Sequence, residues 1–343
     1  MELVNTMQAL HTPLCDMLSC KHPILLAGMG GVSRHALAAA VSRAGGFPVL
    51  GMVREPATRI RAEVKALREH ISAPFAVNLI PAATDKAVLH AQVNACLQLK
   101  VPFIELFWDI DQDLIHHLKA EGVQVIHQIG NRHDAEQALE AGVDILIAQG
   151  CEAGGHIRGT TSTLALLADL TSQCPVPVVA SGGIASGKGL AAALALGAQG
   201  VNLGTALLAT DESNAHPHHK QRIVDAGTDD TIYTRCFYRN WHEPAPVRVL
   251  ANRVTRWNHV ESSTDTPVII GQQDGQVVYL SSTDSPLADA TGDIDAMAIY
   301  AGQGCGQITQ VVPVQQRMTE ILQEALNTLK LMERTLAIDA AAL

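Results

Sequence analysis

A short loop near the middle of the chain gathers side chains that could take part in catalysis. The apolar run 145–148 is long enough for one buried strand, and the chain becomes polar and rich in glycine directly after it. This loop carries five chemically active side chains: Gln149, Cys151, Glu152, His156 and Arg158. A loop that follows a buried strand and holds one imidazole is a common place for catalysis, because histidine exchanges a proton near neutral pH. The alternative is a turn whose histidine faces the solvent.

Eight short apolar runs provide the elements that would position this loop. The expected strands are 24–27, 47–50, 75–79, 103–107, 123–129, 145–148, 176–180 and 200–203. Helical patterns follow them, and Ser33 and Ser186 are the expected caps of two of these helices. Short strands that are apolar throughout are typical of parallel strands buried on both faces. Eight such units predict an α/β fold of the (β/α)8 TIM barrel type.

An open doubly wound sheet is the alternative architecture. Its dinucleotide fingerprint requires three glycines in the pattern G-x-G-x-x-G after the first strand. The chain has Gly28 and Gly30, but Ser33 stands where the third glycine is needed. The closed barrel is therefore the better prediction.

The strand–helix rhythm ends near residue 209 and divides the chain into three predicted parts. These are a cofactor-binding TIM barrel at 1–212, a smaller mixed module over the barrel mouth at 213–290, and C-terminal helices at 291–343 that pack back on the barrel. Amphipathic helices are expected at 292–301 and 314–336, and the histidine-rich segment 216–219 is expected to be a solvated loop rather than a metal site. The module's aromatic residues include Tyr233, Phe237, Tyr238, Trp241 and Trp257.

Composition excludes several classes of protein. Of the 343 residues, 47% are hydrophobic and 17% charged, which indicates a globular chain, and the net charge of −10 argues against nucleic acid or an anionic membrane as a partner. The seven scattered cysteines without a C-x-x-C pair, and an N-terminus without a signal-peptide pattern, favour a reducing cytoplasm. The apolar stretch 189–209 contains a turn at 197–200, so a buried helix and strand are expected there instead of a membrane span.

Active sites of TIM barrels lie at the carboxyl ends of the strands. The loops at 181–183 and 203–205 are rich in glycine, follow the last two strands and lead into helices. Phosphate groups in such barrels frequently bind there, because glycines expose backbone N–H groups and a helix N-terminus favours an anion. A phosphorylated ligand is predicted, which could be a sugar phosphate, a nucleotide or FMN. Simple tight turns are the alternative.

Other strand ends carry amides and carboxylates. Asn78, Gln128 and Gln149 offer both donors and acceptors, which suits a flat heterocycle such as a flavin, although an asparagine after a strand is often only a turn residue. Glu105 and Asp109 could act as acid or base, and a strand-end salt bridge is the more modest interpretation. Cys151 is interpreted as a small loop residue and not a nucleophile.

Several motifs resemble the FMN-dependent nitronate monooxygenase family, also called 2-nitropropane dioxygenases. They are PILLAGMGGVS, the AGG turn at 44–46, AQGCEAGGHIRGT, VPVVASGGI, NLGTALLATDES and GDIDAMAIYAGQGCGQI, and they cover most of the chain. The same pattern extends to FMN-dependent enoyl-acyl-carrier-protein reductases and to NADH:quinone reductases. The resemblance therefore indicates fold and cofactor better than reaction.

Roles for single residues follow from this resemblance. His156 would be the catalytic base, with no metal involved, and the substrates would be a small alkyl nitronate and O2. The FMN contacts implied are Ala27, Gly28, Met29, Asn78, Gln128 and Gly155, with Ser181, Gly182, Gly183, Gly204 and Thr205 at the phosphate. The chain departs from the family at Gly28, where proline is common, and at Phe47-Pro48, where a Gly-x-Gly pattern is common. A homodimer is left open.

Three activities are compatible with these observations. The first is oxidation of alkyl nitronates by an FMN enzyme. The second is reduction of a quinone or an enoyl thioester by NAD(P)H through the same cofactor. The third is a flavin- or phosphate-binding protein without turnover.

Overall fold

Eight parallel strands form the centre of the molecule in the computed structural model, which describes residues 10–241, 245–256 and 267–340. Trp257 and residues 1–9 of the predicted barrel segment lie outside this range. The strands are β1 (Ile24–Leu26), β2 (Val49–Gly51), β3 (Ala76–Leu79), β4 (Phe103–Phe107), β5 (Gln124–Ile129), β6 (Ile145–Gln149), β8 (Val178–Ser181) and β9 (Gly200–Leu203). Their order in the sheet is β1-β9-β8-β6-β5-β4-β3-β2.

Backbone hydrogen bonds bring the two ends of this sheet together. The N–H of Phe47 donates to Ile24 O at 2.8 Å, and the N–H of Leu26 donates to Phe47 O at 3.0 Å. Phe47 lies two residues before β2 and forms a parallel bridge with Leu25. The predicted TIM barrel is confirmed as a nearly closed barrel of eight parallel strands, and the open-sheet alternative is wrong.

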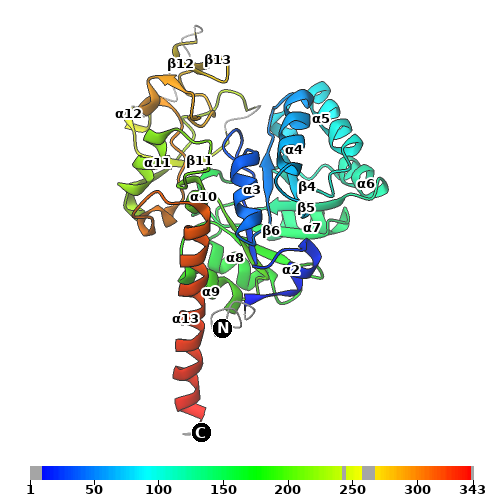
Figure 1. Ribbon diagram of the computed structural model, residues 1–343, viewed down its shortest axis with the longest axis vertical. Helices are drawn as coiled ribbons and strands as arrows, with labels where there is room; N and C mark the ends of the chain where they lie inside the picture. The colour runs from blue at the N-terminus through cyan, green and yellow to red at the C-terminus, as the bar shows by residue number, and fades with distance from the viewer. Residues whose placement is uncertain (1–9, 242–244, 257–266, 341–343) are drawn as a thin grey trace.

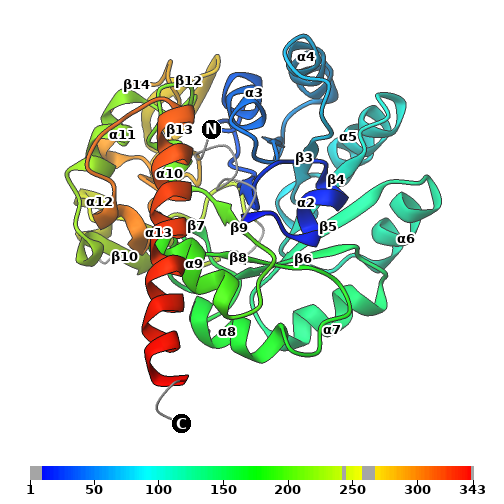
Figure 2. The same ribbon diagram turned by 60° about the horizontal axis from the view of Figure 1, so that its bottom comes forward.

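A ring of helices surrounds the barrel (Figure 2). Its members are α3 (His35–Arg43), α4 (Ala57–Arg68), α5 (Lys86–Gln98), α6 (Gln112–Ala120), α7 (Arg132–Glu140), α8 (Thr163–Leu170) and α9 (Gly187–Ala195). Shorter turns of helix are α2 (Pro13–Leu18), η2 (Pro81–Ala83) and α10 (Thr205–Leu208). Ser186 caps α9 as predicted, since its hydroxyl accepts from Gly189 N. The stretch 189–209 is a helix followed by the buried strand β9, also as predicted.

Ser33 does not cap α3, contrary to expectation. The helix begins at His35 with Arg34 as its N-cap. The Ser33 hydroxyl instead donates to Ala27 O at 2.8 Å and lies 3.3 Å from Met29 N. It therefore ties together the loop that follows β1.

A second set of elements follows the barrel in sequence and lies beside it (Figure 1). It comprises α11 (Pro217–Val224), η3 (Thr228–Asp230), β10 (Thr231–Thr234), β11 (Val247–Leu250), α12 (Arg253–Arg256), β12 (Ile269–Gln273), β13 (Gln276–Tyr279), β14 (Thr291–Gly292), η4 (Ile294–Ala296) and η5 (Gln303–Gln307). β11 pairs antiparallel with β10 on one side and with β7 (Gly155–His156) on the other. The loop that bears His156 is therefore hydrogen-bonded to this second set of elements.

Two sequence predictions in this region are wrong. Residues 216–219 are not a solvated loop: His216 accepts from His218 N as the N-cap of α11, and His219 is fully buried with its Nε2 2.8 Å from Tyr300 O. Burial lowers the pKa of His219 to about 4, so its ring is neutral. Segment 292–301 does not form the predicted amphipathic helix; after β14 its helical part is the short η4. Residues 296–299 are all apolar and buried, so they present no polar helix face.

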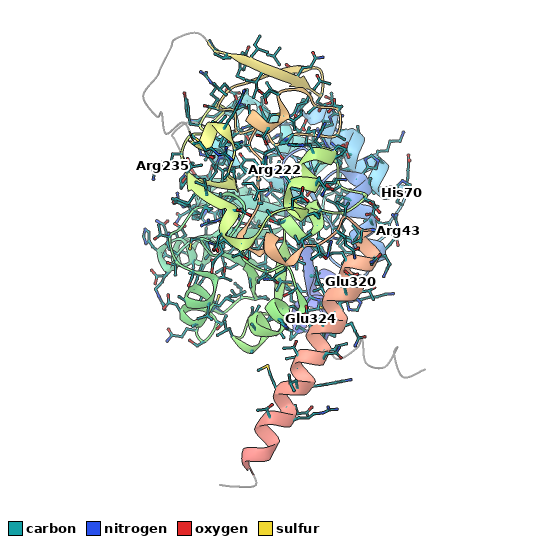
Figure 3. The ribbon with its side chains drawn as sticks, turned by 90° about the vertical axis from the view of Figure 1, so that its left-hand side faces the viewer. Arg43, His70, Arg222, Arg235, Glu320 and Glu324 are labelled. Carbon is teal, nitrogen blue, oxygen red and sulfur yellow. The ribbon has the colours of Figure 1, made fainter. Side chains whose placement is uncertain are left out.

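The predicted helix at 314–336 is confirmed as α13 (Val314–Ala340). Its first half packs on α9, where the Glu324 carboxylate accepts from Gly187 N at 2.7 Å, and the remainder extends beyond the body of the molecule (Figure 3). In the portion of the chain that the structure describes, no helix has the length and apolar character needed to cross a membrane. The division of the chain at residues 212 and 290 stays a prediction.

Candidate active site

A cavity of about 650 Å³ lies at the carboxyl ends of the barrel strands. Its walls come from the barrel loops and from the second set of elements, including Trp241 and Tyr300. The residues that the family resemblance assigns to FMN or to catalysis all line it: Ala27, Gly28, Met29, Asn78, Gln128, Gly155, His156, Ser181, Gly182, Gly183, Gly204 and Thr205. Glu105 and Gln149 line it too, whereas Asp109 does not. The fold thus brings together residues spread over 179 positions, from 27 to 205.

The loop after β8 has the backbone geometry of an anion site. Gly182 and Gly183 have φ of +105° and +70°, which side chains rarely adopt. The carbonyl of Gly182 accepts a hydrogen bond from the Thr163 hydroxyl at 3.0 Å. Among the described residues, no acceptor takes the N–H of either glycine. Free N–H groups of consecutive residues suit an anion such as phosphate.

Several buried polar atoms around this cavity have no partner within the described chain. They are Asn78 Oδ1, Glu105 Oε2, His156 Nε2 and both Asn202 side-chain atoms. A buried polar group without a hydrogen bond costs about 1–3 kcal/mol. Such a concentration at one cavity indicates a site that a polar ligand completes.

Glu105 lies beneath the loop after β1 and departs from its predicted role. Its Oε1 accepts from Asn78 Nδ2 at 2.9 Å, and no cation of the described residues pairs with it, so the expected salt bridge is absent here. Burial raises the pKa of this carboxyl to about 7, against the opposing effects of Asn78 and the Gly28 N–H. A salt bridge does form at Asp109, whose carboxylate lies 3.4 Å from Arg158.

Gly28 explains one departure from the family pattern. A Cβ added to this residue would lie 2.3 Å from the Cβ of Asn78, closer than any real contact. A proline at position 28 would therefore displace Asn78. The glycine lets the first loop approach β3 closely.

His156 is held by its own loop and by β11. The Gln149 amide donates to His156 O at 2.9 Å and accepts from Arg158 N at 3.1 Å, so Gln149 shapes this loop. The Nε2 of His156 is buried, and the solvent-facing alternative is wrong. Burial, with a smaller effect of the Arg54 charge, lowers the pKa of His156 to about 3. The imidazole is neutral at physiological pH.

Sequence reasoning missed Trp241, Tyr300 and Arg54 as parts of this cavity. Asn202, whose place at the end of a strand the sequence indicates, does line it. The three missed residues come from irregular segments, and nothing in their local sequence indicates that they lie near His156.

Thiol and metal chemistry receive little support from the structure. Burial is the main cause that raises the pKa of the Cys151 thiol, which disfavours the nucleophilic thiolate. The carbonyl of Cys151 accepts from the Arg248 guanidinium at 2.8 Å, so this residue contributes to the loop's backbone. Within the described ranges, no group of three metal-ligating side chains occurs.

Comparisons with known proteins agree with this geometry. A family model described as nitronate monooxygenase matches residues 11–94 and 81–324. The chain is 29% identical to a probable nitronate monooxygenase of Bacillus subtilis, over 89% of this chain and 96% of that protein. The solved structure of FabK from Thermotoga maritima superimposes with a TM-score of 0.83 at 31% identity, covering 95% of this chain and 99% of FabK.

A relative with a different activity is also similar. A Rhodococcus jostii protein named (3aS,4S,5R,7aS)-5-hydroxy-7a-methyl-1-oxo-octahydro-1H-indene-4-carboxyl-CoA dehydrogenase is 34% identical over 67% of this chain, and the matched region spans 64% of that protein's length. Different reactions therefore occur among proteins that share this sequence pattern. Since the family model matches well over half of the chain, the protein is an oxidoreductase of the nitronate monooxygenase family, whose members are flavoenzymes.

Proposed function

We propose that the cavity binds FMN. The cluster of buried polar atoms without partners, next to the free N–H groups of Gly182 and Gly183, is the observation that carries this proposal. Ser181, with Gly204 and Thr205 after the neighbouring strand β9, would complete the phosphate site. Ala27, Gly28, Met29 and Gly155 would lie along the ring system, and Asn78 and Gln128 would contact its polar edges.

The donor set suits this cofactor. A flavin offers both hydrogen-bond donors and acceptors, and asparagine and glutamine side chains supply the complement of each. Asn202 has a donor and an acceptor that are both buried and without partner among the described residues. The cavity volume of about 650 Å³ lies in the usual range for small-molecule sites.

The reaction that we propose is oxidation of small alkyl nitronates with O2. Bound flavin would supply the electron transfer, and the protein would position the substrate beside it. His156 would be the catalytic base when the substrate is a neutral nitroalkane, and its neutral ring would donate a hydrogen bond to the oxygens of a nitronate. A pKa of about 3 makes this imidazole a weak base. That weakness suits a nitronate, which is already deprotonated, better than a neutral nitroalkane.

Reduction of a quinone or an enoyl thioester by NAD(P)H is the second candidate. The similarity to FabK over nearly the full length of both chains favours it. The same cavity would then hold an acceptor in place of O2. We further infer a cytoplasmic location, because none of the seven cysteines forms a disulfide. A homodimer remains a prediction.

We expect the purified protein to be yellow and to carry noncovalent FMN. Two neighbouring loops of the cavity suit a single phosphate site. The chain lacks the dinucleotide fingerprint G-x-G-x-x-G that FAD binding often uses. Visible absorption followed by heat release and chromatography identifies the cofactor. Recovery of FAD, or no flavin even after incubation with FMN, would contradict the proposal.

A further inference from the structure

Trp241 covers one face of His156 inside the cavity. The imidazole and indole rings are stacked, with centroids 3.7 Å apart and planes inclined by 19°. The two residues come from different parts of the chain: β7 in a barrel loop carries His156, and Trp241 lies between β10 and β11. Both line the cavity. The indole therefore occupies space directly beside the proposed base.

A second tryptophan, Trp108, packs against both rings without itself lining the cavity. Trp108 meets Trp241 edge-on at 5.1 Å and His156 edge-on at 6.1 Å. Trp241 and Trp108 also pack on the small apolar cluster of Ile80, Ala83 and Phe107. Trp241 thus has apolar packing behind it, unlike the polar side of the cavity around Asn78 and Asn202.

The segment that carries Trp241 is fixed to the barrel by Arg54. The Arg54 guanidinium donates to Asn240 O at 2.9 Å and to the Asp284 carboxylate at 2.8 Å. The Asn240 amide in turn donates to Asp284 at 3.0 Å. Arg54, Trp108 and Asn240 have φ of +58°, +87° and +71°. Such conformations are unfavourable for residues with a side chain and persist only where surrounding contacts impose them.

We propose that Trp241 is the specificity-determining residue of this site and excludes substrates with a bulky group beside the nitro-bearing carbon. The inference rests on the proposed reaction at His156. A substrate carbon held beside His156 also lies beside the indole, which leaves room for short linear chains. Because Arg54 and Asn240 hold the indole in place, a larger group cannot displace it without breaking those hydrogen bonds.

Binding of two ligands of different width tests this proposal. Anaerobic calorimetry, with the flavin of the purified protein reduced beforehand so that no turnover occurs, would measure its affinity for nitroethane and for nitrocyclohexane. Removal of the indole in Trp241→Ala opens space only on this side of the cavity, so we expect affinity for nitrocyclohexane to rise about tenfold or more. Affinity for nitroethane should change by no more than about threefold, because so short a chain does not need the space that the indole vacates.

Matched variants separate the indole's size from general damage. Trp241→Phe keeps a ring beside His156 and should retain the parent's preference for nitroethane over nitrocyclohexane. If Trp241→Ala does not fold, Trp241→Leu takes its place in the test. Tyr233→Ala removes an exposed aromatic residue that does not line the cavity and should bind as the parent does. Trp241→Ala binding nitrocyclohexane no better than the parent would overturn the proposal.

A titration of His156 by NMR gives a readout without substrate. The parent ring should stay neutral down to about pH 4, and Trp241→Ala should raise its pKa because water reaches the uncovered face. A raised pKa without a gain in nitrocyclohexane affinity would contradict the proposal, since the indole would then only shield the ring. If the parent protein does not turn over nitronates, the proposed function is rejected, but the test of Trp241 still stands. Neither the ligand affinities nor the titration of His156 depends on turnover.

Discussion

Replacing Gly183 with aspartate should abolish retention of FMN, and the same is expected of Gly182→Asp. Both residues lie where the phosphate would be held, and an aspartate would bring a carboxylate against it. Two unit charges 4 Å apart repel by about 4 kcal/mol at an effective dielectric constant of 20, which is a loss of about three orders of magnitude in affinity. Fluorescence titration of the cofactor-free protein with FMN would measure it.

Gly183→Asn is the matched control for the charge. Asparagine has the shape of aspartate and tolerates the left-handed conformation at φ +70° about as well. A Cβ at this position would lie 3.2 Å from the Cβ of Glu152, so both variants pay the same steric cost. We expect Gly183→Asn to bind FMN more tightly than Gly183→Asp by at least about tenfold. Equal affinities, or normal FMN content in both aspartate variants, would place the phosphate elsewhere.

His156→Asn should lower turnover of neutral nitroalkanes by about 10²-fold, the lower end of the usual contribution of a general base, because a pKa of about 3 makes this imidazole a weak base. A nitronate needs no base, so the variant should keep a larger fraction of its nitronate activity. FMN content should be unchanged, because Gly182 and Gly183 are intact. Steady-state oxygen consumption with both substrate forms would measure the difference. His70→Asn, which changes an exposed histidine on the outside of the barrel, is the control.

The pH profile distinguishes a desolvated base from an exposed one. Protonation removes the lone pair that accepts the substrate proton, so activity with a neutral nitroalkane is lost as the pH falls through the pKa of His156. Because that pKa is about 3, we expect no falling limb from His156 between pH 8 and pH 5. A limb near pH 6.5 that disappears in His156→Asn would show an exposed imidazole. If the His156→Asn variant oxidises neutral nitroalkanes at the parent rate, His156 is not the catalytic base.

Local patterns were sufficient to predict the barrel and much of the cavity. Short apolar runs specify buried parallel strands, and the barrel topology then places the carboxyl end of each strand at one mouth. That geometry explains why Asn78, Gln128 and the glycine loop at 181–183 meet although they lie far apart in sequence. The long helix α13 was equally clear, because its amphipathic period continues over many turns.

Contacts between distant segments could not be predicted in this way. The pairing of β7 with β11 joins residues 155–156 to 247–248, and no periodicity in either segment indicates it. The stacking of Trp241 on His156 depends on that pairing and on Arg54. His219 looked solvated because its neighbours are polar, yet tertiary packing buries it against Tyr300 O. Among the described residues Glu105 has no cation beside it for the same reason, because the fold sets Asn78 against it instead.

Anaerobic mixing of the flavin-loaded protein with propyl nitronate or with NADH tests the central claim most directly. The visible flavin band reports whether electrons reach the cofactor, without the complication of O2. The account predicts that nitronate bleaches the band within the turnover time, that NADH leaves it unchanged, and that admission of O2 restores it. Bleaching by NADH with no effect of nitronate would contradict nitronate oxidation and assign the protein to the NAD(P)H-dependent reductases.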